Sequence, residues 1–73
     1  MKSKWLRFLL VEEKPKTSIW RVENKDKDFL GHIRWNSQWR QYCFMPDANT
    51  IYSAGCLREI ADFIKEQMDK REK

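Results

Sequence analysis

The sequence predicts an α+β domain in which an antiparallel meander sheet of four to five strands carries one C-terminal helix packed on one face. Two observations support this fold class. Between residues 5 and 45, short segments rich in β-branched and aromatic residues alternate with polar turns. From Ser53 onward the apolar period lengthens to about 3.6 residues, which is that of an amphipathic helix. We expect a single domain over residues 1–73.

Turn-forming residues divide the first part of the chain into strands. Pro15 marks the first turn, the polar run 24–28 is a loop, and Pro46 ends the last long strand because proline cannot continue a ladder. The predicted strands span 5–11, 17–23, 29–35 and 39–45, and a short edge strand over 50–52 is left open. Residues 5–11 fit both a strand and a short helix.

The predicted helix spans about 54–69, with Ser53 as its N-cap. Its apolar side is one stripe that must cover the sheet, because the sheet is the only other layer. The stripe consists of Leu57, Ile60, Ala61, Ile64 and Met68, with Cys56 and Phe63 at its border.

Length and composition indicate how the domain is stabilised and in which cellular compartment it works. A chain of 73 residues buries only roughly 60% of its unfolded surface, so self-association would add useful stability. Arg7 interrupts the first apolar run and Glu12-Glu13 follows it, which does not fit a signal peptide, and no apolar run is long enough to span a membrane. We therefore expect a cytoplasmic protein, without membrane association, in which Cys43 and Cys56 are free thiols.

The register of the hairpin between strands 29–35 and 39–45 decides which residues share a face. A three-residue loop, Asn36-Ser37-Gln38, would place Trp35 opposite Trp39 and Arg34 opposite Arg40. One face is then the core: Phe29, Gly31, Ile33, Trp35, Trp39, Gln41, Cys43 and Met45. The other is aromatic and basic: Leu30, His32, Arg34, Arg40, Tyr42 and Phe44. A two-residue loop at Asn36-Ser37 would instead put Arg40 and Tyr42 beside Ile33 and Trp35, and mix charge into the core.

The aromatic and basic face is the predicted binding site, since no acid lies between Asp28 and Asp47. The absence of acidic residues from this segment also has a simpler interpretation, which is that β-strands in general contain few of them. The arginines would contact anions, and the aromatic rings would stack or become buried in an interface. The predicted binding residues are Arg34, Arg40 and Tyr42, supported by Trp39, His32 and Phe44.

These residues predict a non-enzymatic binding module. Protein association, including homodimerisation, comes first, because aromatic residues and arginine are enriched in interfaces. Binding of single-stranded nucleic acid through the same face is the alternative. We expect neither a metal site nor a small-molecule cofactor, because Cys43, Cys56 and His32 lack metal-ligand spacing, and no nucleophile or general base converges with a partner.

Three stretches of the sequence resemble a family of short uncharacterised bacterial proteins, some of them carried on mobile elements. They are Leu30-Gly31-His32-Ile33-Arg34-Trp35, the run from Trp39 to Pro46 with its Trp-Arg-x-Tyr-x-Phe string, and Gly55-Cys56-Leu57 with Ile60, Phe63 and Ile64. The resemblance spans about residues 14–68. It implies no established activity and no site residue, and the association with mobile elements favours nucleic-acid or regulatory roles over metabolism.

Overall fold

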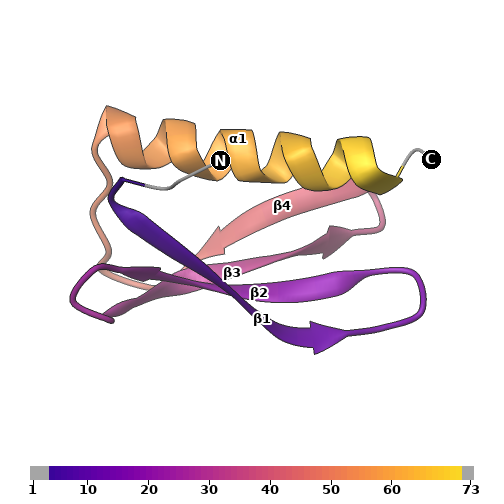
Figure 1. The fold of residues 1–73 in the computed structure, drawn as a ribbon, viewed down its shortest axis with the longest axis horizontal. Coiled ribbons are helices and arrows are strands. Elements are labelled where there is room, and N and C mark those ends of the chain that lie inside the picture. The colour runs from indigo at the N-terminus through magenta and orange to yellow at the C-terminus, as the bar shows by residue number, and fades with distance from the viewer. Residues whose placement is uncertain (1–3, 72–73) are drawn as a thin grey trace.

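The computed structural model describes residues 4–71 as one sheet and one helix (Figure 1). The strands are β1 (Leu6–Glu13), β2 (Ser18–Asn24), β3 (Phe29–Asn36) and β4 (Gln41–Pro46), and the helix is α1 (Ala54–Arg71). The strands are antiparallel and follow one another in the order β1-β2-β3-β4. Helix α1 lies along one side of this sheet (Figure 1).

The predicted fold class is confirmed: an antiparallel meander carries a single C-terminal helix on one face. Residues 6–13 form a strand, which settles the choice between strand and helix for this segment. Residues 50–52, which the sequence left open as a short edge strand, form no strand. There the hydroxyl of Tyr52 donates to the Leu30 carbonyl at 2.8 Å, so the segment is fixed by side-chain bonding.

The core lies between α1 and the sheet face below it. Phe63 of α1 stacks on Phe8 of β1 with ring centroids 4.3 Å apart, and Trp20 of β2 meets Phe63 edge-on at 5.1 Å. Such aromatic contacts add to the burial of apolar area. The buried hydrophobic residues are Leu6, Val22, Leu30, Ile33, Tyr42 and Ile60.

Helix α1 is rotated slightly from its predicted orientation. Ser53 caps it as predicted, since its Oγ accepts from the Cys56 N–H at 3.2 Å. Ile60 is buried, but Leu57 is 51% exposed and Ala61 is also exposed. The predicted apolar stripe was therefore too wide, because Leu57 and Ala61 belong to it but are not buried against the sheet. They form an exposed apolar border along α1.

A bulge in β3 reverses the expected positions of two residues. Val22 pairs with Gly31 but Glu23 pairs with Phe29, so Leu30 is the extra residue and turns into the core. Phe29 was expected in the core, yet it lies on the opposite face, where the Arg21 guanidinium sits 4.4 Å from its ring centroid.

Candidate functional site

The turn between β3 and β4 has four residues, 37–40, and is held by Asn36. The side-chain oxygen of Asn36 accepts from the N–H groups of Gln38 and Trp39, each at 3.0 Å. Its main-chain carbonyl accepts from the Arg40 N–H at 2.7 Å. Arg40 closes the turn in the left-handed region, with φ of 57°. The expected three-residue loop is therefore wrong.

This turn changes the pairing of the hairpin. Trp35 lies opposite Tyr42 and Arg34 lies opposite Cys43, so the predicted pairs of Trp35 with Trp39 and Arg34 with Arg40 do not form. Because side chains alternate between faces, a change of parity exchanges the two faces of β4. The alternative two-residue loop has the wrong length, but it places Tyr42 on the same face as Ile33 and Trp35, as in the structure.

The predicted binding residues are consequently divided among three places. Tyr42 is buried and Phe44 half-buried on the face that α1 covers, so neither belongs to an open face. His32 and Arg34 lie on the opposite, open face. Trp39 and Arg40 are exposed in the turn. The six residues do not form one site.

Tyr42 has a structural position. Its hydroxyl accepts from the Ser18 N–H at 3.1 Å, and Trp20 and Trp35 meet its ring edge-on at 5.2 and 5.3 Å. Cys43 also differs from expectation. We placed it in the core, on the face opposite to His32, but it points to the same side of the sheet as Arg34 and His32. Cys43 and Cys56 are both free and half-buried.

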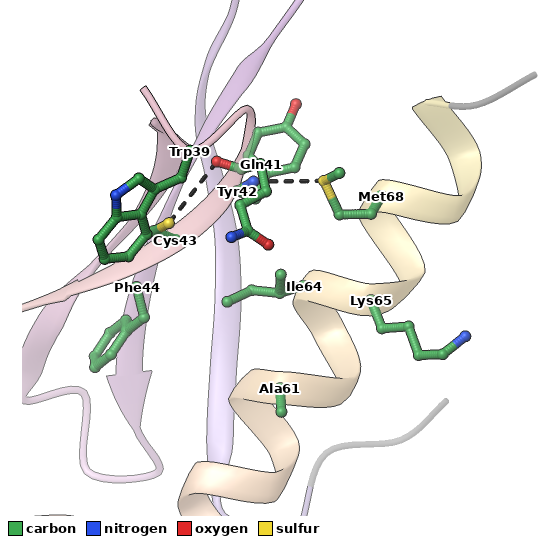
Figure 2. A pocket seen from close by; sticks show the side chains of 9 residues that line it. All are labelled: Trp39, Gln41, Tyr42, Cys43, Phe44, Ala61, Ile64, Lys65 and Met68. Atoms are coloured by element: carbon green, nitrogen blue, oxygen red, sulfur yellow. Dashed lines mark hydrogen bonds between the residues drawn. The ribbon is translucent and has the colours of Figure 1, made fainter. Parts of the chain in front are cut away.

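A groove of about 650 Å³ lies between β4 and α1 (Figure 2). Trp39 lies in the turn before β4 and Cys43 lies on β4, and Ile64 and Met68 face the strand from the helix (Figure 2). Lys65 contributes to the helical wall, and its ammonium group contacts Asp69 at 3.3 Å. The complete lining is Trp39, Gln41, Tyr42, Cys43, Phe44, Ala61, Ile64, Lys65 and Met68. We call this feature the β4–α1 groove.

The backbone of β4 presents hydrogen-bonding groups to this groove. Within residues 4–71 the sheet ends at β4, so one side of the strand has no neighbouring strand. The Tyr42 N–H points to that side and donates to Met68 Sδ at 3.4 Å, a weak acceptor. Because backbone direction alternates along a strand, Phe44 also presents its N–H and C=O away from β3. The groove thus has apolar walls along a free strand edge.

The open face of the sheet is chemically mixed. Glu23 holds Arg21 at 2.5 Å and Arg7 at 3.7 Å, so two of its cations are already paired. A smaller hollow of about 300 Å³ contains both Glu12 and Arg34. It is lined by Val11, Glu12, Ile19, His32 and Arg34. This face therefore lacks the strong positive charge that the sequence led us to expect.

The groove residues on α1 were not predicted as part of a site. Ala61, Ile64 and Met68 fit a core stripe, and their spacing alone does not reveal that the sheet ends beside them. Among residues 4–71, no cluster of three potential metal ligands occurs. In the same described range, no helix combines the length and the apolar character needed to cross a bilayer.

Comparison with known proteins adds no identification. No family model matches the chain, and no curated protein or solved structure shows significant similarity to it. The resemblance to short bacterial proteins stays a prediction.

Proposed function

We propose that the protein is a non-enzymatic protein-association module that accepts an extended strand in the β4–α1 groove. The observation that carries this proposal is the coincidence of an apolar groove with the free edge of β4. An added strand takes its main-chain hydrogen bonds from the edge and its specificity from pockets for alternate side chains.

The two walls of the groove suit alternating side chains. A strand about 4.8 Å from β4 would direct every second side chain toward α1, where Ile64 and Met68 present apolar atoms. The intervening side chains would meet Trp39, which is 66% exposed. Exposed tryptophan is typical of interface centres because it buries a large area at low conformational cost.

A display library of linear twelve-residue peptides, selected on the immobilised protein at nanomolar concentration, tests this function. We expect enriched peptides with apolar residues at alternate positions. Ala61→Arg fills the groove from the helical wall, at an exposed position where arginine favours a helix, and should weaken binding of the selected peptides at least tenfold. Arg34→Ala on the open face is the control and should bind them normally. Selected peptides that bind Ala61→Arg as well as the parent chain would place association elsewhere.

A second candidate function is binding of single-stranded nucleic acid by the open face. The observation that favours it is the grouping of Arg21, Phe29 and His32, in which the Phe29 ring contacts both the guanidinium and, at 4.9 Å, the imidazole. Stacking rings next to cations suit exposed bases and phosphates. Fluorescence anisotropy with a labelled oligothymidine distinguishes this function from protein association. The affinity for the oligonucleotide must fall steeply as the salt concentration rises, and it must depend less on salt in Arg34→Ala. Affinity that does not change with salt would exclude it.

A further inference from the structure

We infer that the strand accepted in the groove is β4 of a second copy of this chain, paired antiparallel about Cys43. This inference rests on the proposed function and names its partner. The resulting dimer would have one continuous sheet of eight strands with both helices on the same face. A two-fold axis perpendicular to the sheet and close to Cys43 generates it.

The register follows from which groups of β4 point outward. Tyr42 and Phe44 present their N–H and C=O groups to the groove, and they lie symmetrically about Cys43. Antiparallel pairing of Tyr42 with Phe44 of the second copy, and the reverse, therefore forms four main-chain hydrogen bonds. In two of them the Tyr42 N–H exchanges its weak bond to Met68 Sδ for a carbonyl acceptor. Pro46 has no N–H, and the Arg40 N–H is already bonded to the Asn36 carbonyl, so neither residue can complete a shifted pairing. The register centred on Cys43 is therefore the symmetric one in which every outward N–H and C=O group of Tyr42 and Phe44 is bonded.

The side chains along the edge are compatible with a copy of themselves. A strand edge that avoids pairing usually carries charged residues, a proline in its middle or a bulge. Residues 41–45 are Gln-Tyr-Cys-Phe-Met, without a charge or a proline, and β4 pairs with β3 in unbroken register. The edge of β1, in contrast, has a bulge between Leu10 and Glu12 and ends in two glutamates.

Helix α1 supplies a second, matching contact. Leu57, Ala61, Ile64 and Met68 follow each other at spacings of four, three and four residues, which is the seam of a helix pair. Leu57 and Ala61 on this seam are exposed, and small Ala61 permits close approach of two helices. Residues 61–68 of α1 lie beside Cys43, because both line the groove. The two-fold axis near Cys43 that pairs the two β4 strands therefore also brings these apolar rows of the two α1 helices together in antiparallel orientation.

The charges on α1 permit this arrangement. Antiparallel helices centred near residue 63 would bring Lys65 of one copy close to Asp62 of the other, so the cation in the groove wall gains an opposite charge. The net charge of +4 on each chain opposes association at low ionic strength. Salt should therefore strengthen this dimer, whereas it would weaken binding of an acidic partner or of nucleic acid.

The pairing of Cys43 with its copy gives a specific chemical test. Opposed residues in a pair without mutual hydrogen bonds have Cα atoms about 4.5 Å apart, which is within the range that a disulfide spans. Diamide, which is reduced as it takes the two thiol hydrogens, should convert the dimer into a species of twice the 9.0 kDa chain mass. Peptide mapping of this species should find Cys43 joined to Cys43, with no linkage through Cys56.

The decisive experiment combines this cross-link with sedimentation equilibrium of the unmodified chain and of Cys43→Lys. We expect a dimer at micromolar concentration, and at least tenfold weaker association in Cys43→Lys, where two added ammonium groups would face each other. Val11→Lys is the matched control, because it adds the same charge at an exposed position of β1 and should leave the association constant within a factor of two. Circular dichroism of both variants checks that they are folded.

The outcomes separate the inference from the proposed function. A monomer at millimolar concentration overturns the inference, and so does a dimer that is indifferent to Cys43→Lys or cross-links through Cys56. The chain could instead be monomeric, while display peptides bind it and Ala61→Arg abolishes their binding. In that case the proposed function is retained, and its partner is a protein other than a second copy of this chain. If neither self-association nor peptide binding occurs, both fail.

Discussion

Trp35 and Tyr42 lie directly opposite each other in the β3–β4 ladder, with ring centroids 5.3 Å apart and ring planes at 83°. This pair fixes the orientation of β4. It places Tyr42 beneath α1 and sends Cys43 to the open side of the sheet, and it leaves the outer edge of the strand facing the β4–α1 groove. The candidate site is therefore a consequence of one cross-strand pairing.

The Tyr42 hydroxyl gives a first test of this pairing. Tyr42→Phe removes the acceptor of the Ser18 N–H in a side chain that is only 5% exposed. We expect the free energy of unfolding to fall by about 1–2 kcal/mol in urea titrations, because a partly buried donor loses its partner. Tyr52→Phe is the same substitution on a less buried residue, whose hydroxyl donates to the Leu30 carbonyl. Unchanged stability in Tyr42→Phe would mean that the hydroxyl faces water and that the register is different.

Glu59 is expected to attach β1 to the helix. Its carboxylate accepts from the backbone N–H groups of Lys4 and Trp5 at 2.9 Å and of Leu6 at 3.1 Å. Glu59→Ala should lower the free energy of unfolding by about 1–2 kcal/mol, since hydrogen bonds to a charged acceptor are stronger than neutral ones and two of these are exposed.

A matched control for Glu59 lies on the same helix. The carboxylate of Glu66 contacts only the exposed ammonium of Lys70, at 3.9 Å, among the ion pairs of the described residues. Glu66→Ala should therefore cost no more than about 0.5 kcal/mol. Equal losses in the two variants, measured by urea unfolding, would contradict the specific role of Glu59.

Gly31 should tolerate no side chain. A Cβ atom there would lie 2.4 Å from the Met45 carbonyl oxygen and 2.9 Å from the Cα of Pro46, both of which belong to the backbone of β4. Gly31→Ala must separate β3 from β4, so we expect a loss of at least about 2 kcal/mol in thermal or urea unfolding.

Gly55→Ala provides the contrast to Gly31→Ala. The added Cβ would also be close to its neighbour, at 2.5 Å, but that neighbour is the far edge of the Trp5 ring, a side chain that is 45% exposed and free to turn. Alanine also favours the helix by roughly 1 kcal/mol over glycine. The predicted change is small, and a Gly55→Ala variant as unstable as Gly31→Ala would show that the Trp5 ring is held firmly.

The salt dependence of self-association gives a further prediction. Two chains of charge +4 repel each other, and the Debye length shortens from roughly 14 Å at 0.05 M salt to about 4 Å at 0.5 M. We expect the dimerisation constant, measured by sedimentation equilibrium, to rise about threefold or more over this range. A constant that falls with salt would mean that attraction between opposite charges, such as Lys65 and Asp62, outweighs the repulsion between the two net charges, and would contradict this prediction.

Much of the fold follows from local sequence signals. Alternation of apolar residues located the four strands, and Ser53 marked the start of the helix because its hydroxyl caps the first turn. These signals act within a few residues, so they can be recognised without knowledge of the tertiary structure.

The register could not be read in the same way. Arg40 adopts a left-handed conformation, a position that glycine or asparagine usually occupies. Since the sequence has neither residue there, it did not indicate a four-residue turn. The bulge at Leu30 likewise depends on Gly31 meeting the backbone of β4. Each irregularity moves residues to the other face, which is why Phe29, Tyr42 and Cys43 were assigned to the wrong sides.

The most direct test of strand addition at the β4 edge is hydrogen exchange at the Phe44 amide, measured by NMR at increasing protein concentration. This N–H points away from β3, so its protection depends on what occupies the groove. We predict that exchange slows at least a hundredfold as the dimer forms, and that Cys43→Lys at the same concentrations remains fast. Exchange of the Phe44 amide that is fast and independent of concentration in a chain shown to be dimeric would contradict pairing through β4.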